Sequence, residues 1–494
     1  MRKYTYLAFD LGAESGRALI GRFEAGVLSV EEIHRFANEP VRYNGELHWD
    51  AARLWWEMQK AMSMTAANHA AKFDGIGLDT WGVDYALLGE GGTLLENPYH
   101  YRDSRTDGIP DRVFSIVPRN EVFARTGIQI MAINTLYQVY AAHLKTPRLL
   151  ELGRYLISIP DLFNFWLTGV IVSEFTIATT TQYYDPRQGR WSTELFSKLG
   201  LPTHLFPAMV QPGTVIGPLL PEVAKEVGIS QCPVIAPACH DTGSAFAAAG
   251  GPSAFISSGT WSLLGTEVKT PVINAEAERL NFTNEGGVCG TFRLLKNISG
   301  LWLLQRCRHD WQLKGQDYSY SELCDLARSK PAFHSLVDPD HESFMRPLIM
   351  TEAIDRFCTM TGQPLPQDPP AYTRAILESL ALKYCVTLNH LERLTGASYD
   401  EIHVVGGGSR NVLLNQFTAE ATARRVVAGP VEATALGNLG MQMLATGAVT
   451  SLDEVRKVIA QSYPVQVFEP TEADKWQEPL ARFEQICGIS SRQS

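Results

Sequence analysis

The first eighty residues alternate short apolar segments with tight polar turns, and this alternation constrains the fold more than any other feature. Strands are predicted at Tyr4–Phe9, Ala18–Phe23 and Val27–Ile33, as an antiparallel meander, because each is an apolar run bounded by turn residues. A helix is predicted from Asp50 to His69 with Asp50 as its N-cap, followed by a strand at Ile76–Asp79. The order β-β-β-α-β predicts a mixed α/β domain.

The second half of the chain repeats this organisation. Strands are predicted at Ala254–Ser258 and Trp261–Val268, and a long helix from Pro370 to Leu394 leads to a buried strand at Ile402–Val405. At roughly 100–200 residues per domain, 494 residues allow two to four domains. We therefore expect two similar domains, residues 1–245 and 246–494, with a hinge among the small uncharged residues of Asp241–Ala249.

The charge balance argues against one class of partner. The chain has 43 Lys and Arg against 53 Asp and Glu, a formal net charge of -10, without long runs of one sign. Proteins that bind nucleic acid or anionic membranes need a basic face that displaces counterions. We therefore expect small-molecule ligands and neither nucleic acid nor a membrane as partner. A phosphate ligand stays compatible with the charge, because a helix N-terminus and a few donors can hold it locally.

The sequence also predicts a compartment. Asp10 interrupts the N-terminal segment before a signal-peptide apolar region could form, and the charge-free stretch from Thr242 to Thr266 is rich in Gly, Ser and Thr. The eight cysteines are scattered, without a CxxC pair or a Cys/His run at metal-ligand spacing. We expect a cytoplasmic protein with reduced, mostly buried thiols, and a monomer is compatible with this pattern.

Several segments place polar residues or glycines directly after predicted strands. In Asp10–Arg17, an aspartate at a strand end is followed by a glycine turn and small polar residues. Exposed backbone N–H groups and a carboxylate at one strand end can hold a phosphate and a metal ion together. A plain hairpin turn with a surface aspartate is the alternative from this segment alone.

A second segment, Cys239–Ser244, follows the apolar run Val234–Ala238. An aspartate that leaves a buried strand into a Gly/Ser-rich turn can accept a proton from a substrate hydroxyl, so Asp241 is a candidate general base, and His240 could donate to the substrate. The alternative is that Asp241 caps the following helix and that His240 is a satisfied core histidine.

Three further segments suit a sugar and a nucleotide. Asp79–Asp84 puts Trp81 between two carboxylates, which suits a sugar platform, although an ordinary partly buried tryptophan is the alternative. Ser257–Ser262 is a hydroxyl-rich turn with a glycine, and Val404–Asn411 joins a buried strand to three glycines, where a flat ligand such as a purine could lie. The chain lacks GxGxxG, GxxxxGK[ST], GxSxG and HExxH motifs, which argues against Rossmann, P-loop, serine-hydrolase and zincin chemistry.

Taken in order, these segments resemble the FGGY family of carbohydrate kinases over nearly the whole chain. Further segments that are similar to the family are Tyr101–Thr106, Asn134–Gln138, Asn284–Gly287, Lys296–Gln305, Val405–Asn415 and Ala428–Thr434. The resemblance implies an α/β fold of two actin/hexokinase/Hsp70-like (ribonuclease H-like) domains with a ligand cleft between them. It also implies ATP- and Mg²⁺-dependent phosphorylation of a sugar.

Within that family, the segments are most similar to members that phosphorylate L-rhamnulose at its O1 hydroxyl in L-rhamnose degradation. The alternatives are another FGGY kinase, acting on L-fuculose, L-ribulose or D-xylulose, and an actin- or Hsp70-like ATP switch that phosphorylates nothing. The aspartate of the His240–Thr242 segment and the sugar-like strand end favour the kinase over the switch.

By position, the resemblance implies a role for each site residue. Asp241 is implied to be the general base, and Asp10 to lie near Mg²⁺. The implied sugar contacts are Gly82, His240, Asp241, Thr242 and Asn297, and the implied ATP contacts are Ala13, Glu14, Ser15, Gly16, Arg17, Thr260, Gln305 and Gly407. Many family members carry Thr or Ser at the places of Ala13 and Glu14, so the phosphate turn matches the family only in part. Glu14 would place a negative charge beside the phosphates; a protonated or Mg²⁺-facing Glu14 is one alternative, and we expect it to face solvent.

Overall fold

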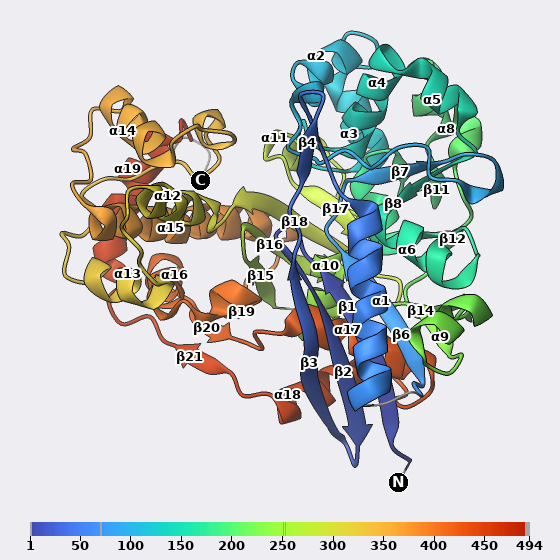
Figure 1. Ribbon diagram of the computed structural model, residues 1–494. Helices are drawn as coiled ribbons and strands as arrows, with labels where there is room; N and C mark the ends of the chain where they lie inside the picture. Colours follow the sequence, from blue (N-terminus) through green and yellow to red (C-terminus); the bar gives the residue numbers. More distant parts are fainter. Residues whose placement is uncertain (1, 70–71, 250, 252, 490–494) are drawn as a thin grey trace. The chain divides into compact units, whose positions relative to one another are not determined.

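The computed structural model describes residues 2–69, 72–249, 251 and 253–489 (Figure 1). The chain forms two compact units. Unit 1 consists of Met1–Gly250, Glu267–Leu294 and Ala433–Tyr463, and unit 2 consists of Gly251–Thr266, Leu295–Glu432 and Pro464–Ser494. Each unit therefore combines segments that are distant in sequence, which differs from the two continuous halves that we expected.

Unit 1 is built on a six-stranded sheet of order β13-β14-β6-β1-β2-β3. Its strands are β1 (Tyr4–Leu11), β2 (Ser15–Glu24), β3 (Val27–Ala37), β6 (Gly75–Thr80), β13 (Thr214–Pro218) and β14 (Pro233–Ala236). The first three strands form the predicted antiparallel meander, which is thereby confirmed. Strand β6 runs parallel to both β1 and β14, so the carboxyl ends of these three strands meet at one edge of the sheet.

The predicted first helix is confirmed as α1 (Ala51–Asn68). The Asp50 side chain caps it by accepting from the backbone N–H of Arg53 at 3.0 Å. Leu54, Met58 and Met62 recur every fourth residue and are buried, because this spacing places them on one face of a helix. Helix α1 lies along the sheet in Figure 1.

The residues of the expected hinge, Asp241–Ala249, form helix α10 (Asp241–Ala249), which is almost wholly buried inside unit 1. The expected domain boundary at residues 245 and 246 therefore falls within a helix. Helix α10 packs closely against α17 (Ala433–Ala445): a Cβ atom added to Gly437 would lie 1.7 Å from the Ser244 carbonyl oxygen. At Ser244 and Gly437, small residues allow the two helices to approach each other closely.

The rest of unit 1 consists of short elements. Helices are α2 (Ile109–Phe114), α3 (Arg119–Thr126), α4 (Thr135–Lys145), α5 (Pro147–Leu152), α6 (Ile159–Thr168), α7 (Phe175–Ala178), α8 (Thr193–Lys198), α9 (Pro221–Val227), α11 (Ala275–Arg279) and α18 (Leu452–Ser462). Two-stranded pairs are β4 (Val41–Tyr43) with β5 (Glu46–His48), β7 (Tyr85–Leu88) with β8 (Tyr155–Ser158), β9 (Ser173–Glu174) with β12 (Met209–Val210), and β10 (Tyr184–Asp185) with β11 (Arg190–Trp191). Tyr137, Phe196 and Leu205 belong to a second apolar core beneath these elements.

A seven-stranded sheet, most of which belongs to unit 2, has the order β17-β18-β16-β15-β19-β20-β21. Its strands are β15 (Ala254–Ser258), β16 (Trp261–Val268), β17 (Thr283–Gly286), β18 (Phe292–Ser299), β19 (Glu401–Val405), β20 (Arg425–Ala428) and β21 (Gln466–Phe468). The helices of unit 2 are α12 (Trp302–Leu313), α13 (Tyr320–Ala327), α14 (Met350–Met360), α15 (Pro369–Thr395), α16 (Val412–Thr422) and α19 (Gln477–Ile486). The predicted strands β15, β16 and β19 and the long helix α15 are confirmed.

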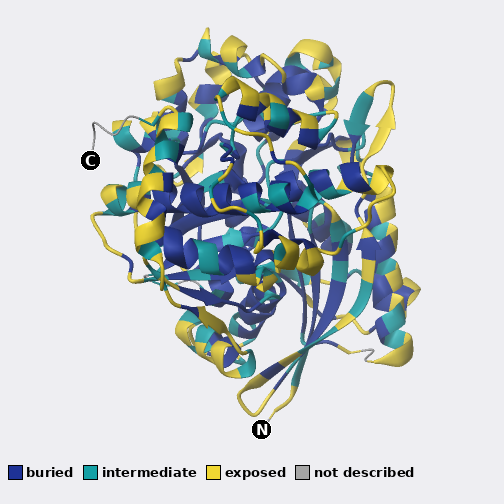
Figure 2. Cartoon of the chain, turned by 90° about the vertical axis from the view of Figure 1, so that its left-hand side faces the viewer, coloured by how far each residue is buried: buried dark blue, intermediate teal, exposed yellow. Residues whose placement is uncertain are grey.

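Burial follows the expected pattern of an α/β protein. Buried residues concentrate in the strands and on the inner faces of the helices (Figure 2). All eight cysteines are free thiols, and five of them are buried while Cys289 is exposed. Within the described ranges, none of the helices has both the length and the apolar character needed to cross a membrane.

Candidate active site

Two aspartates and an arginine meet where β1 and β6 end. Asp10 and Arg17 are cross-strand partners, and Arg17 donates from Nε and Nη2 to Asp10 Oδ2 at 3.0 and 2.7 Å. Asp79 is the register partner of Asp10 on β6. Asp79 is fully buried: its Oδ2 accepts from Asn438 at 2.6 Å, while its Oδ1 has no hydrogen-bond partner among the residues that the structure describes. Burial, and next the neighbouring Asp10, raise the pKa of Asp79 well above its usual value.

The turn after β1 is held by backbone contacts. Gly12 N–H donates to the Ser15 carbonyl, and Asn38 donates from its side chain to Gly12 O at 2.8 Å and from its backbone to Glu14 O at 3.0 Å. Glu14 is exposed, while Ala13 and Ser15 are half-buried. Gly16 is buried in β2, and a Cβ there would lie 2.3 Å from the Phe36 ring. Packing alone therefore requires a glycine at this position, whatever else the turn holds.

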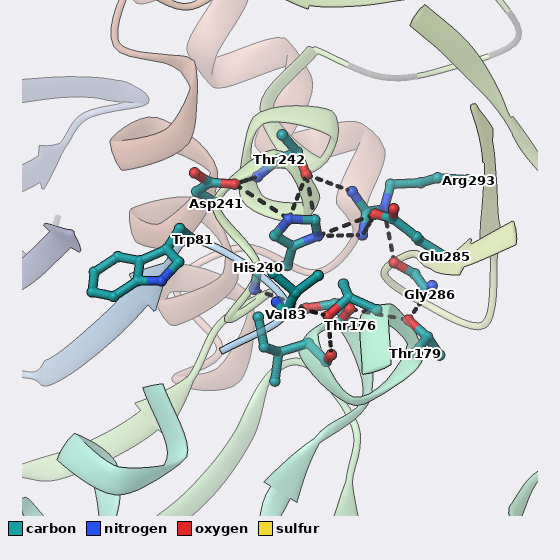
Figure 3. Close-up of polar contacts among 12 residues, drawn as sticks. Trp81, Val83, Thr176, Thr179, His240, Asp241, Thr242, Glu285, Gly286 and Arg293 are labelled. Atoms are coloured by element: carbon teal, nitrogen blue, oxygen red, sulfur yellow. Dashed lines mark hydrogen bonds and ion pairs between the residues drawn. The ribbon is translucent and has the colours of Figure 1, made fainter. Parts of the chain in front are cut away.

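His240, Asp241 and Thr242 lie where the chain leaves β14 and enters α10 (Figure 3). Asp241 is the first residue of α10; its Oδ1 accepts from Thr242 N–H at 2.6 Å and lies 3.5 Å from His240 Nε2. Its side chain is 29% exposed. Burial raises the pKa of Asp241; His240 opposes this rise, and Asp10 adds to it. One carboxylate oxygen thus accepts from the next N–H of the helix, and the side chain still reaches solvent. Asp241 lies inside α10 and not at its N-cap position, so the alternative of a capping aspartate is not confirmed.

Gly82 lies next to His240. A Cβ atom on Gly82 would lie 3.1 Å from His240 Nε2, so the structure brings these two predicted sugar contacts together. Val83, the next residue, has a φ of 67°, which is rare for a β-branched side chain. Its N–H donates to Thr180 Oγ1 at 3.3 Å and its carbonyl accepts from Thr135 Oγ1 at 2.6 Å. Strained backbone held in this way clusters at functional turns.

Trp81 and its neighbouring carboxylates do not form the predicted sugar platform. Trp81 is 5% exposed, and its indole N–H donates to Asp84 Oδ2 at 3.0 Å. The same Asp84 oxygen accepts from Trp49 at 2.6 Å, and Asp84 Oδ1 accepts from Gln138 at 2.8 Å. Both Asp84 oxygens and Asp79 Oδ2 accept hydrogen bonds within the chain, so these atoms are not available to sugar hydroxyls. Asp79 Oδ1 is buried without such a partner among the described residues. The alternative, a buried tryptophan, is confirmed.

The buried carboxyl group of Asp84 predicts how the free energy of unfolding depends on pH. Burial raises the pKa of Asp84 from 3.8 to about 6. The unfolded chain therefore loses this proton first as the pH rises, and the contribution of Asp84 to the free energy of unfolding falls by about 3 kcal/mol between roughly pH 4 and pH 6. Asparagine does not titrate, so Asp84→Asn removes this pH-dependent contribution to the free energy of unfolding. Urea unfolding of both proteins across this range is expected to show the wild type losing stability relative to the variant; parallel curves would contradict it.

Glu174 supports the segment that carries Asp241, and no sequence motif pointed to it. It is completely buried at the N-cap of α7, where its Oε2 accepts from Cys239 N–H at 3.0 Å and from Thr176 Oγ1 at 2.6 Å. Thr176 Oγ1 in turn accepts from His240 N–H at 3.1 Å. Burial raises the pKa of Glu174 to about 7. The sequence does contain one indication of a special role, because Glu174 is the only charged residue between positions 170 and 184.

The remaining predicted residues lie in unit 2. Thr260 forms the turn between β15 and β16, and Gln305 on α12 donates to its Oγ1 at 3.2 Å. Gly407 follows β19 and is exposed, and a Cβ added there would meet nothing within 4 Å. Packing therefore leaves open space over Gly407. Asn297 lies half-buried on β18. The structure thus brings together Thr260 with Gln305, and His240 with Gly82, Asp241 and Thr242.

A divalent cation fits the residues at the ends of β1 and β6. In the described part of the chain, no group of three or more His, Cys, Asp or Glu side chains is arranged to hold a metal ion. Mg²⁺ in phosphate sites, however, takes most of its ligands from phosphate and water and only one or two from carboxylates. Asp10 and the buried, unbonded Asp79 Oδ1 supply oxygens of this kind. A cation beside Asp79 would also favour its ionised form.

Two relatives that are similar over nearly the whole chain carry the same name, rhamnulokinase. A rhamnulokinase of Bacteroides thetaiotaomicron is 44% identical over 484 residues, covering 97% of this chain and 99% of that protein. A rhamnulokinase of Oceanobacillus iheyensis is 38% identical over 464 residues, covering 94% of this chain and 97% of that protein. The chain therefore spans nearly the full length of both relatives.

Two solved structures share the fold. A ligand-bound xylulose kinase from Lactobacillus acidophilus superposes with a TM-score of 0.81 at 18% identity, covering 98% of this chain and 97% of that one. Plasmodium falciparum glycerol kinase with ADP superposes with a TM-score of 0.78 at 15% identity, covering 99% of both chains. The predicted two-domain, actin/hexokinase-like α/β fold is confirmed.

Family models match both halves of the chain. The N-terminal domain of the FGGY family of carbohydrate kinases matches residues 5–248, and the C-terminal domain of that family matches residues 254–446. Together with the near full-length relatives, these matches mean that the chain belongs to the FGGY family of carbohydrate kinases.

Proposed function

We propose that this carbohydrate kinase transfers the γ-phosphoryl group of ATP to the O1 hydroxyl of L-rhamnulose, giving L-rhamnulose 1-phosphate and ADP. The family membership implies a sugar and ATP as small-molecule substrates. The rhamnulokinase name of the relatives supports the choice of sugar. The observation that carries the proposal is the carboxylate of Asp241, partly exposed and adjacent to His240 and Thr242.

Asp241 acts as the general base. The O1–H proton passes to its carboxylate as O1 forms a bond to the γ-phosphorus, and the bond from that phosphorus to the β,γ-bridging oxygen breaks with its electron pair leaving on ADP. Because burial raises the pKa of Asp241, its carboxylate is a better proton acceptor than one in water. His240, Thr242 and the Gly82 backbone orient the sugar beside it. Alignment of this kind is the main demand that phosphoryl transfer makes on a protein.

The residues proposed to contact ATP are those that the family resemblance implies. In unit 1, the Ala13–Arg17 segment supplies backbone N–H groups and the Arg17 guanidinium, which Asp10 already holds in place. In unit 2, the proposed ATP contacts are Thr260, which accepts from Gln305, and the open backbone at Gly407. When bound, Mg²⁺ neutralises charge on the phosphates; Asp10 and Asp79 would hold it.

A coupled ADP-release assay tests this function across a panel of sugars. We expect turnover with L-rhamnulose to exceed that with L-fuculose, L-ribulose and D-xylulose, to stop with EDTA and to return with Mg²⁺. Without sugar, ADP release is expected to be far slower, since water must be excluded until the sugar binds. Faster turnover of another ketose would change the substrate assignment, and a sugar-independent ATPase of equal rate would favour the nucleotide-switch alternative.

A further inference from the structure

Arg293 on β18 is a buried cation that the proposed chemistry does not use. It is fully buried, and its Nε donates to the Gly286 carbonyl at 2.8 Å. Its Nη1 donates to Thr242 Oγ1 at 2.9 Å, and its Nη2 lies 3.1 Å from His240 Nδ1 (Figure 3). A guanidinium that contacts two residues of the proposed sugar site at once, without reaching solvent, is well placed to orient them.

The charge of Arg293 is balanced from β17. Glu285 is buried, and its Oε2 lies 3.2 Å from Arg293 Nη2 and 3.2 Å from His240 Nδ1. A guanidinium without a counter-ion would be costly to bury, so Glu285 and Arg293 have to be considered as a pair. This pair lies behind His240, on the side of its Nδ1 atom.

The donor-only character of arginine determines the proton position on His240. A guanidinium carries five N–H donors and no acceptor. The Nη2 hydrogen bond requires a lone pair on His240 Nδ1, whereas Glu285 Oε2, 3.2 Å from the same atom, would favour a proton there. The arginine contact has hydrogen-bond geometry and the glutamate contact is an ion-pair distance only, so we infer that the ring proton of the neutral imidazole is on Nε2. That Nε2 atom lies 3.5 Å from Asp241 Oδ1 and next to Gly82. Thr242 Oγ1 likewise accepts from Arg293, and it lies 3.2 Å from both ring nitrogens of His240, so the guanidinium also determines in which direction the Thr242 hydroxyl can donate.

We propose that Arg293, paired with Glu285, is a positioning residue that holds His240 in the Nε2–H form and orients Thr242, so that both present hydrogen-bond donors to the sugar beside Asp241. The inference rests on the proposed sugar site at His240–Thr242. It assigns a role to two residues that have no contact with the reacting atoms. It also explains why a buried charged pair stands in the chain where an apolar pair would pack without an electrostatic cost.

The direct test is the proton position itself. In enzyme labelled with ¹⁵N-histidine, the two ring nitrogens of a neutral imidazole have widely separated shifts, so the spectrum tells which one carries hydrogen. The His240 signals are identified by their loss in His240→Gln. We expect an unprotonated Nδ1 in the wild type. A proton on Nδ1 would overturn the proposal, whether or not any variant folds and whichever sugar the enzyme uses.

The kinetic test removes both charges together, in Arg293→Met/Glu285→Gln, so that no unpaired charge remains buried. We expect kcat/KM for the sugar to fall about 10- to 100-fold, the equivalent of one or two misplaced hydrogen bonds. The KM for ATP should stay unchanged, and the His240 signals should move. Arg293→Lys keeps the charge but lacks the planar fork, so it is expected to recover stability without recovering kcat/KM for the sugar.

The matched control is Arg456→Met/Glu267→Gln, which removes another partly buried Arg–Glu pair of unit 1. Arg456 and Glu267 lie 2.7 Å apart, and Arg456 donates to the Phe246 carbonyl on α10. This control should lose stability yet keep the His240 signals and kcat/KM for the sugar. Equal kinetic loss in both double variants, with unmoved His240 signals, would mean that Arg293 is only structural. If the wild type had no sugar kinase activity, the proposed function would be refuted, but the position of the ring proton on His240 could still be tested by the ¹⁵N measurement.

Discussion

Asp241→Asn is expected to lower kcat by about 10²–10⁴-fold, the usual contribution of a general base. Asparagine has nearly the same size, and its Oδ1 can still accept from Thr242 N–H, so the start of α10 is preserved. The amide has no capacity to take up the O1 proton. Sugar and ATP binding, measured by calorimetry, should therefore stay within a few-fold of the wild type while turnover in the ADP-release assay is nearly abolished.

A matched control for this substitution is Asp368→Asn. Asp368 caps α15 in unit 2 and accepts from Ala371 N–H at 3.0 Å, so it is also an aspartate at a helix start, but it lies outside the site. This variant is expected to keep its kcat and to lose some stability. An Asp241→Asn enzyme with near-normal kcat would refute the assignment of the base, even if the sugar preference were as proposed.

Gly437→Ala is expected to destabilise unit 1 by about 3 kcal/mol, at the upper end of overpacking effects. The added methyl group would lie 1.7 Å from the Ser244 carbonyl oxygen, and backbone cannot rotate away as a side chain can. Helices α10 and α17 must therefore separate. Alanine would otherwise favour a helix over glycine by about 1 kcal/mol, so a measured loss shows that the contact outweighs propensity. Since α10 begins at Asp241, turnover should fall too.

Gly217→Ala provides the same chemical change without the clash. Gly217 lies in β13, where the nearest heavy atom to an added Cβ, on Thr168, is 3.6 Å away, an ordinary contact. Urea unfolding should show a clearly smaller loss for Gly217→Ala than for Gly437→Ala. Equal stability of Gly437→Ala and the wild type would mean that α10 and α17 do not pack as closely as the structure has them.

Local sequence patterns determined the secondary structure that surrounds the site. The meander β1–β3, helix α1 with its Asp50 cap, and the strands before Asp241 and Gly407 were predictable because apolar periodicity and turn residues act over a few positions. The position of Asp241 after an apolar run was predictable for the same reason. These patterns, and the order of the motifs along the chain, were enough to identify the family resemblance.

Long-range contacts decided the rest. A run of small residues such as Asp241–Ala249 is compatible with a hinge or with a tightly packed helix, and only the approach of Gly437 to Ser244 selects the helix. The sequence predicted Asp84 as a sugar contact, but in the structure its oxygens accept hydrogen bonds from Trp49 and Gln138, which are distant in sequence. Arg293 and Glu174 likewise carry no local motif. Their roles come from partners many positions away, which a periodic pattern cannot encode, because hydrogen-bond partners are chosen by the tertiary fold.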